Sequence, residues 1–163
     1  MNIYLVGFMG SGKSAVGPIL ARLMGREFAD TDALVGDIPG IFRSKGEEAF
    51  RDMESAVISS VSRRKGLVVS LGGGALLRPE NRAAVGRSGK TVYLRCAASA
   101  LIERLSRSKG RPLLAGGDLR SRIEELMKKR RPHYEKADIT VRVGGRSVRE
   151  LAEAILRRLK RAP

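Results

Sequence analysis

The first feature able to do chemistry is a glycine-rich segment, residues 7–14, which reads Gly-Phe-Met-Gly-Ser-Gly-Lys-Ser. It has the P-loop spacing G-x-x-x-x-G-K-[ST], and it stands between an apolar run at 3–6 and a helical pattern. Small residues let successive N–H groups bind phosphate oxygens, and a helix beginning near Lys13 adds its positive end. Lys13 can reach the outer phosphates, and the Ser14 hydroxyl can ligate Mg²⁺. Because every fixed position is filled, we expect a nucleoside triphosphate to bind here, and an ordinary turn is the weaker interpretation.

A pair of carboxylates, Asp30 and Asp32, follows a short strand expected at 27–29. Alternate residues of an extended chain point the same way, and parallel strands end at the crevice where ligands bind. One carboxylate can hold the shell of a magnesium ion, and the other can accept a proton from a substrate hydroxyl. The alternative is a solvated turn or a helix cap, but the P-loop upstream favours a site.

Two further segments carry groups suited to a small anionic substrate. The triple glycine 72–74 follows a buried strand expected at 67–71, and glycines let a ligand approach the backbone closely. Arg51 and Glu54 lie three residues apart in a helical pattern, so Glu54 can orient Arg51. A flexible turn and a surface ion pair are the alternative interpretations.

Two segments headed by or rich in arginine follow later in the chain. Arg111 opens the glycine-rich stretch 111–118, which suits a lid that closes over a triphosphate. The basic run 128–134 contains Arg130 and reaches Pro132, where we expect the helix to end or kink. Its arginines could bind a carboxylate in a fork geometry. The alternatives are a plain surface loop and a basic helix end that interacts with its own dipole.

Short apolar strands alternate with helical patterns along the chain, and no linker or repeat interrupts them. We expect strands at 3–6, 27–29, 67–71, 91–94 and 139–143. We expect helices at 13–24, 46–64, 79–87, 98–106, 118–137 and 147–160. This alternation is typical of an α/β fold in which helices cover both faces of a parallel sheet. A chain of 163 residues is expected to form one domain over 1–163.

The formal net charge of +15 at pH 7 favours anionic ligands and non-specific contact with nucleic acid. Aromatic residues make up only 4%, so we expect no specific nucleic-acid partner, and a nucleic-acid-binding NTPase is the weaker alternative. No apolar run approaches the length of a membrane span, and no membrane partner is expected. The single cysteine, Cys96, is interpreted as a buried thiol of a cytoplasmic protein, which we expect to be a monomer.

Taken in order, these segments resemble shikimate kinase over nearly the whole chain. The matching segments are 7–14, 30–32, Gly46-Glu47 with Phe50-Arg51 and Glu54, 70–74, 111–114, and Arg130 with Pro132 and Tyr134. The resemblance implies a P-loop NTPase fold of three α/β/α layers with a five-stranded parallel sheet. It places an acceptor-binding segment at about 31–60 and a lid at about 107–120. It also implies transfer of the γ-phosphoryl group of ATP, with Mg²⁺, to the 3-hydroxyl of shikimate, in the pathway to chorismate. Another small P-loop kinase, acting on gluconate or a nucleoside monophosphate, is the alternative.

The resemblance also implies a role for each matched residue. Lys13 resembles the lysine on the β- and γ-phosphates, Ser14 the direct Mg²⁺ ligand, and Asp30 an anchor of the ion through water. Asp32 resembles the carboxylate that orients and deprotonates the 3-hydroxyl, and Arg111 the lid arginine that neutralises the transferring phosphate. The implied ATP-binding residues are Gly10, Ser11, Gly12, Lys13, Ser14, Ala15, Arg104, Arg111 and Arg146. The implied substrate-binding residues are Asp32, Arg51, Gly73, Gly74 and Arg130, with the two arginines on the carboxylate. Lys13, Asp32 and Arg111 form the implied catalytic set.

One segment departs from the family pattern. Between Asp32 and Ile41 the chain is shorter than family members usually are, and in the family this segment covers the substrate. We therefore expect a more open acceptor pocket and a higher KM for shikimate.

Overall fold

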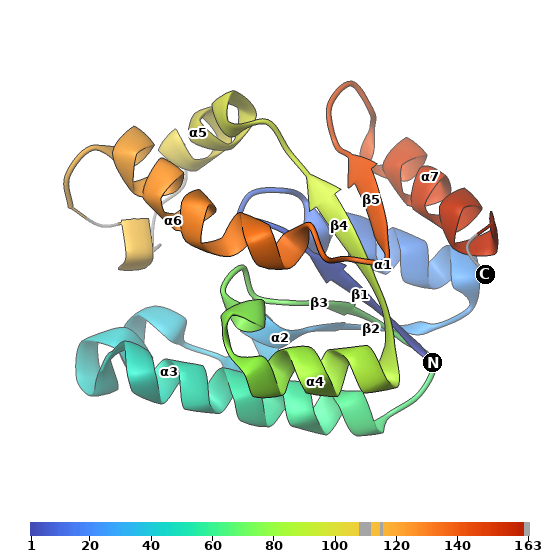
Figure 1. Ribbon diagram of the computed structural model, residues 1–163, viewed down its shortest axis with the longest axis horizontal. Helices are drawn as coiled ribbons and strands as arrows, with labels where there is room; N and C mark the ends of the chain where they lie inside the picture. The colour runs from blue at the N-terminus through green and yellow to red at the C-terminus, as the bar shows by residue number, and fades with distance from the viewer. Residues whose placement is uncertain (108–111, 115, 162–163) are drawn as a thin grey trace.

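The structure, a computed structural model, describes residues 1–107, 112–114 and 116–161. Within these residues, five parallel strands form one sheet in the order β2-β3-β1-β4-β5, seen in the middle of Figure 1. The strands are β1 (Asn2–Val6), β2 (Glu27–Asp30), β3 (Leu67–Ser70), β4 (Gly89–Arg95) and β5 (Ile139–Arg142). The expected five-stranded parallel sheet is therefore confirmed.

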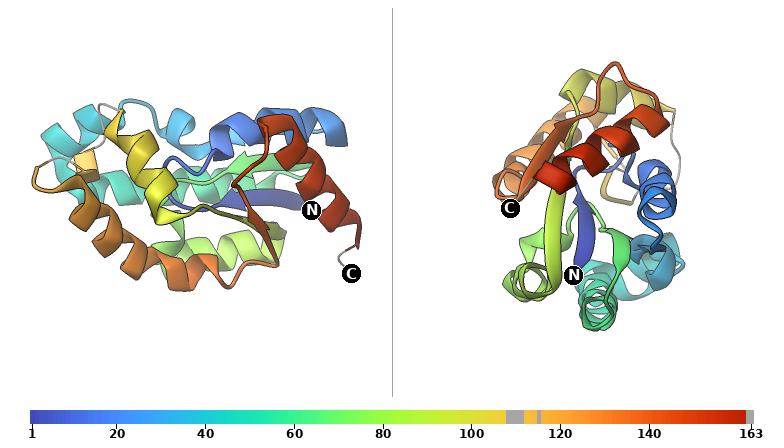
Figure 2. Two further views of the ribbon diagram at one scale, coloured as in Figure 1. Left: turned by 90° about the horizontal axis from the view of Figure 1, so that it is seen from above. Right: turned by 90° about the vertical axis from the view of Figure 1, so that its right-hand side faces the viewer.

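Helices cover both faces of this sheet. They are α1 (Lys13–Met24), α2 (Thr31–Val35), α3 (Ile38–Arg63), α4 (Pro79–Ser88), α5 (Ala98–Ser106), α6 (Leu119–Tyr134) and α7 (Val148–Arg161), with short 3₁₀ turns η1 (Ala75–Leu77) and η2 (Pro112–Leu114). Helices α1 and α7 pack together on one face, and α4 and α6 lie on the other (Figure 2). Helix α3 packs against α2 and α4, and α5 packs against α6. None of the helices in the described ranges is long and apolar enough to cross a bilayer.

The central strands β1 and β3 form the middle of the core, and their carboxyl ends lie at the same edge of the sheet. Every residue of β1 and β3 is buried, as expected for parallel strands covered on both faces. Leu5 of β1 pairs with Ser70 of β3, and Val6 pairs with Tyr93 of β4. The segments that follow β1 and β3 therefore leave the same edge of the sheet, which brings the P-loop beside the triple glycine.

Helix α3 begins eight residues earlier than the sequence predicted. The carboxylate of Asp37 accepts a 3.0 Å hydrogen bond from Gly40 N, and Pro39 occupies the first turn, where its missing N–H costs nothing. Gly46, the expected start, is instead a break inside the helix, with φ 81° and ψ 177°. Glycine tolerates this positive φ without strain, so the helix changes direction there and continues.

Two other helices differ in detail from the prediction. Helix α2 was not expected, and it forms because the side chain of Asp30 caps it, accepting a 3.0 Å hydrogen bond from Asp32 N. Helix α6 lies within the predicted range 118–137 but does not end at Pro132, because its helical residues continue to Tyr134. This extension matters because it places Tyr134 one turn beyond Arg130, on the same face of the helix.

Candidate active site

The P-loop follows β1 and wraps around its own lysine. Lys13 is buried, and its Nζ donates hydrogen bonds to the carbonyl oxygens of Gly7 at 2.8 Å and Phe8 at 3.0 Å. A Cβ on Gly7 would lie 2.9 Å from the carbonyl oxygen of Leu94, so only glycine fits between the loop and β4. Helix α1 begins at Lys13, directly after Gly12, and its free N–H groups and dipole favour an anion at this point.

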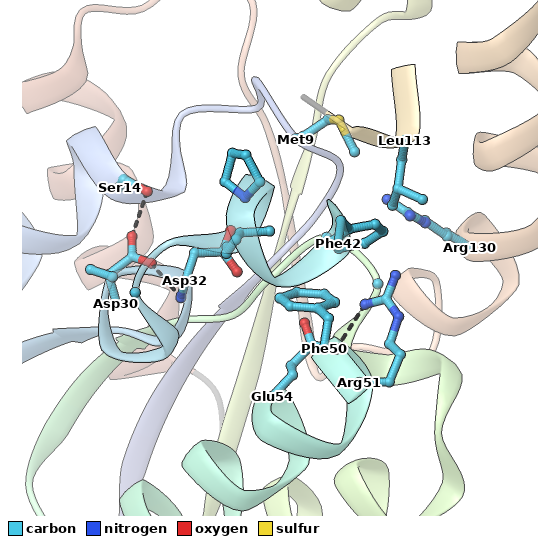
Figure 3. Close-up of a pocket in the computed structure, with 16 residues that line it drawn as sticks. Met9, Ser14, Asp30, Asp32, Phe42, Phe50, Arg51, Glu54, Leu113 and Arg130 are labelled. Carbon is cyan, nitrogen blue, oxygen red and sulfur yellow. Dashed lines mark hydrogen bonds and ion pairs between the residues drawn. The ribbon is translucent and has the colours of Figure 1, made fainter. Parts of the chain in front are cut away.

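A chain of hydrogen bonds joins the start of α1 to the end of β2. Ser14 Oγ donates to Asp30 Oδ2 at 2.6 Å, and Asp30 Oδ1 accepts from Asp32 N at 3.0 Å (Figure 3). Contrary to the prediction, the two aspartates do not lie on one extended segment, because β2 ends at Asp30 and Asp32 lies in the first turn of α2. They nevertheless line the same cavity. Asp30 is both the helix cap that was considered as the alternative and a partner of Ser14.

Thr31, between these aspartates, ties β2 to β3. It is fully buried, and its hydroxyl donates to Ser70 O at 3.2 Å and accepts from Gly72 N at 3.0 Å. One side chain thus fixes the end of β3 and the first glycine of the triple glycine. This residue had no predicted role, although a β-branched hydroxyl between two carboxylates at a strand end could have suggested one.

The second group of site residues is a buried ion pair in α3. Arg51 Nη1 lies 2.8 Å from Glu54 Oε2, and Arg51 Nη2 lies 3.2 Å from Glu47 Oε1. The guanidinium also approaches Gly74, where a Cβ would lie 2.5 Å from Nη1. Burial raises the pKa of the Glu54 carboxyl, and the positive charge of Arg51 opposes that rise. The ion pair holds Arg51 in one orientation beside the triple glycine.

Arg130 of α6 lines the same cavity as Arg51 of α3. It is 2% exposed, and its guanidinium carbon lies 5.5 Å from the centroid of the Phe8 ring, within range of a cation–π contact. Among the described residues, its Nε and Nη1 have no hydrogen-bond partner. Burial lowers the pKa of Arg130. A buried cation with unused donors is a good receptor for an anionic ligand.

These residues line two adjoining cavities. The first, of about 490 Å³, contains Arg51, Glu54 and Arg130, and the second, of about 440 Å³, contains the P-loop. Both cavities are lined by Met9, Ser14, Asp32 and Gly73. Figure 3 shows the first cavity, with the Asp30–Ser14 contact and the Arg51–Glu54 pair at its edges. Asp32 therefore lies where a group bound at the P-loop would meet a molecule held by the arginines.

The comparisons with known proteins agree with this geometry. The shikimate kinase family model matches residues 9–160. The chain belongs to the shikimate kinase family. A shikimate kinase from Synechococcus sp. (strain RCC307) is 43% identical over an alignment of 164 positions, which covers 97% of this chain and 84% of that relative. The structure of shikimate kinase from Acinetobacter baumannii in complex with shikimate superposes with a TM-score of 0.95 at 38% identity, covering 98% of this chain and 93% of that one.

More distant structures share the fold. A gluconokinase from Sinorhizobium meliloti has a TM-score of 0.66 at 25% identity, covering 97% of this chain and 92% of that one. A deoxyadenosine kinase from M. mycoides has a TM-score of 0.63 at 15% identity, covering the whole of both chains, and shows the fold alone. The resemblance to shikimate kinase and the three-layer P-loop fold are confirmed, and the chain is a kinase.

The structure brings most of the predicted site residues of this family member together. The acceptor-side cavity is lined by Asp30, Asp32, Arg51, Gly73, Gly74 and Arg130. The P-loop cavity is lined by Gly10, Ser11, Gly12, Lys13, Ser14, Ala15, Arg104 and Arg146. Arg104 Nη1 donates to Gly10 O at 3.0 Å, whereas Arg146 Nη1 donates to Arg142 O at 2.7 Å. Arg111 lies outside the described residues, and Leu113 of η2 lines the acceptor-side cavity.

Sequence reasoning gave no site role to an aromatic wall of the shikimate kinase cavity. Phe42 and Phe50 both line it, and their ring centroids lie 5.0 Å apart across the break at Gly46. Phe42 could not be placed on a helix before the early start of α3 was known, whereas Phe50 lies within the predicted helix 46–64. The short segment between Asp32 and Ile41 also lines the cavity, through Ala33, Gly36, Ile38 and Pro39. Cys96, expected to be buried, is buried beside Arg104, and burial raises the pKa of its thiol.

Proposed function

We propose that this chain transfers the γ-phosphoryl group of ATP to the 3-hydroxyl of shikimate, giving ADP and shikimate 3-phosphate. The observation that carries the proposal is the meeting of two cavities at Asp32, one lined by the P-loop and the other by two buried arginines. The relative from Acinetobacter baumannii, whose structure is so similar, was solved in complex with shikimate. Membership of the shikimate kinase family supports the same acceptor.

The P-loop side holds the nucleotide in this proposal. The N–H groups of the loop and the first turn of α1 bind phosphate oxygens, and Lys13 leaves its contacts with Gly7 O and Phe8 O to bind the outer phosphates. Arg104 and Arg146 line the same cavity, and in this proposal they contact the base. Arg111 supplies positive charge to the transferring phosphate, as the family resemblance implies.

The oxygen ligands present suit Mg²⁺. Ser14 Oγ and Asp30 Oδ2 lie 2.6 Å apart at the mouth of the P-loop, and both are hard oxygen donors. No group of three or more His, Cys, Asp or Glu side chains suited to a metal occurs in the part of the chain that the structure describes. That absence fits an ion held by few protein ligands, water and nucleotide phosphates. Ser14 would bind Mg²⁺ directly and Asp30 through water, and the bound ion would neutralise phosphate charge.

The acceptor side orients shikimate through its carboxylate. Arg51 and Arg130 offer guanidinium donors from α3 and α6 to one cavity, and two such groups on one carboxylate fix the pose of a small polyol. Gly73 and Gly74 bring backbone close to the ring hydroxyls. Glu54 keeps Arg51 in place through the 2.8 Å ion pair.

Asp32 acts on the attacking hydroxyl. In the ternary complex its carboxylate orients the 3-hydroxyl and accepts its proton as the oxygen bonds to the γ-phosphorus. The bond from that phosphorus to the β-bridging oxygen breaks, and the electron pair leaves on ADP. The position of Asp32 on both cavities supports this role.

A panel of acceptors tests the proposal. Purified protein with ATP and Mg²⁺ is given shikimate, quinate, gluconate or AMP, and ADP release is followed in each case and without acceptor. Shikimate is expected to give the highest kcat/KM. Turnover with gluconate or AMP but not with shikimate would replace the substrate and keep the P-loop kinase. Omitting Mg²⁺ or changing Lys13→Ala is expected to abolish turnover, whichever acceptor is used.

We also propose that the chain works as a cytoplasmic monomer without a nucleic-acid partner. The single cysteine and the aromatic content of only 4% support this view, and the net charge of +15 accounts for weak, non-specific contact with polyanions. Light scattering coupled to gel filtration checks the monomer. Binding of a random RNA that fades between about 50 and 200 mM salt is the expected electrostatic effect, and salt-resistant binding would contradict it.

A further inference from the structure

Tyr134, in the last turn of α6, touches the triple glycine but has no role in the mechanism so far. Its side chain is buried, with 2% of the residue exposed. Its hydroxyl donates a hydrogen bond to the carbonyl oxygen of Gly73, the middle glycine. Tyr134 therefore joins α6 to a loop that lies 61 residues away in the sequence and lines both cavities.

The same face of α6 contacts Gly73 at a second point. Arg130 lies four residues before Tyr134, and its Nη1 is 3.2 Å from the position of a Cβ on Gly73. The ring of Tyr93, on β4, packs against the Tyr134 ring with 5.3 Å between centroids and limits its movement. Burial raises the pKa of Tyr134, so its hydroxyl remains a donor throughout the neutral range.

The hydrogen bond constrains a whole peptide unit. The C=O of Gly73 and the N–H of Gly74 belong to one planar trans peptide, so they point in opposite directions. Fixing the oxygen toward Tyr134 fixes the direction of the Gly74 N–H. Within the described residues, no hydrogen bond uses that N–H as its donor, and Gly74 lines the acceptor cavity. Glycines lose much backbone freedom on ordering, so an anchor has a large effect here.

We infer that Tyr134 is a positioning residue for the acceptor site, which holds the Gly73–Gly74 peptide so that its N–H stays available to shikimate. The inference rests on the proposed function. It also couples the loop to Arg130, because both are set by the same turn of α6. Loss of the Tyr134 hydroxyl then weakens binding of the acceptor. The affinity for the nucleotide and the rate of the chemical step stay nearly unchanged.

The test is Tyr134→Phe, measured by steady-state kinetics with each substrate varied in turn. The KM for shikimate is expected to rise by about five- to tenfold, with kcat and the KM for ATP within about twofold of wild type. Tyr4→Phe is the matched control. Tyr4 is also a fully buried tyrosine, and its hydroxyl bonds to Asn2 at 3.2 Å and Ser88 at 2.6 Å, away from both cavities. That variant is expected to lose stability but to keep the wild-type KM for shikimate.

A second variant keeps the test decisive if Tyr134→Phe folds poorly. Tyr134→4-aminophenylalanine retains a ring and an N–H donor for Gly73 O, and it is expected to bring the KM for shikimate back to within about twofold of wild type. An unchanged KM in Tyr134→Phe, an equal rise in Tyr4→Phe, or no rescue by the amino variant overturns the inference. Failure of the wild-type protein to phosphorylate shikimate in the same assay overturns the proposed function instead.

Discussion

Arg51 and Glu54 form an ion pair that is almost completely buried, with 2.8 Å between Nη1 and Oε2. A buried pair of this kind adds little net stability, because desolvation offsets the attraction. The pair matters for geometry, because Glu54 holds Nη1 and Glu47 contacts Nη2, which keeps the guanidinium beside Gly74 at the cavity. The ion pair within α3 thus orients the arginine that is proposed to bind the carboxylate of the acceptor.

Removing the arginine is expected to abolish recognition of the acceptor carboxylate. In Arg51→Ala, kcat/KM for shikimate should fall by ~10² or more, because a charge-assisted contact is lost and Glu54 is left buried without its partner. The affinity for ATP, measured by calorimetry, should be unchanged. Arg64→Ala is the control, since Arg64 is half exposed and pairs with Glu27 outside both cavities. Equal losses for ATP and shikimate would remove Arg51 from the acceptor site.

The buried carboxyl of Glu54 should give a measurable pH dependence of stability. Burial raises its folded pKa, so its contribution is fully present below the unfolded pKa and is lost as pH rises through the folded pKa. Relative to Glu54→Gln, wild type should therefore lose free energy of unfolding as the pH rises above the unfolded pKa of a glutamate, about 4.3. Urea denaturation of both proteins at a series of pH values measures the difference. A difference that stays constant or grows with pH would show that the pKa is not raised.

Replacing the carboxylate of Asp32 should lower the rate of phosphoryl transfer without changing the binding of ATP. Asp32→Asn should bind ATP normally and lower kcat by ~10² or more if Asp32 accepts the proton. Pre-steady-state and steady-state rates with saturating shikimate give the measurement. A kcat near that of wild type would limit Asp32 to orienting the hydroxyl.

The hydroxyl of Thr31 should contribute more to the free energy of unfolding than its methyl group. Thr31→Val keeps the shape but leaves Ser70 O and Gly72 N without this partner, which should lower the free energy of unfolding by about 2 kcal/mol. Thr31→Ser keeps both hydrogen bonds and removes one buried methyl, so a loss of about 1 kcal/mol is expected. Chemical denaturation ranks the two variants. A Ser variant less stable than the Val variant would mean that packing dominates at this site.

The short segment between Asp32 and Ile41 should weaken binding of the acceptor. Ala33, Gly36, Ile38 and Pro39 line the cavity, and a shorter chain here leaves fewer groups to cover a bound substrate. The KM for shikimate should therefore exceed that of a family member whose segment has the usual length, measured side by side. Equal KM values would show that the segment closes as well as a longer one.

The regular parts of the fold could be predicted from sequence because their signals are local. The apolar runs at 3–6 and 67–71 became β1 and β3, and the P-loop spacing placed Lys13 and Ser14 correctly. Helix α2 and the first turns of α3 were missed, because Asp30 was given a site role with a helix cap only as the alternative, and Asp37 was not considered as a cap. An aspartate such as Asp30 can cap a helix and line a cavity at once, and its place in the sequence does not tell the two roles apart.

Long-range contacts could not be predicted from spacing. The hydrogen bond from Tyr134 to Gly73 and the double contact of Thr31 with Ser70 and Gly72 depend on how the strands and α6 pack. The pattern also suggested that α6 stops or bends at Pro132, although its helical residues reach Tyr134. Proline removes one backbone hydrogen bond, and packing of the buried Arg130 and Tyr134 side chains opposes that loss.

The most direct measurement is the structure of the product itself. Shikimate, ATP and Mg²⁺ are incubated with the protein, and the phosphorylated product is examined by ³¹P–¹H correlation NMR. This separates transfer from ATP hydrolysis stimulated by shikimate, which ADP release alone does not. We expect a phosphate coupled to the proton on C3 of shikimate, formed in step with ADP. Free phosphate with unmodified shikimate, or a phosphate on another hydroxyl, would contradict it.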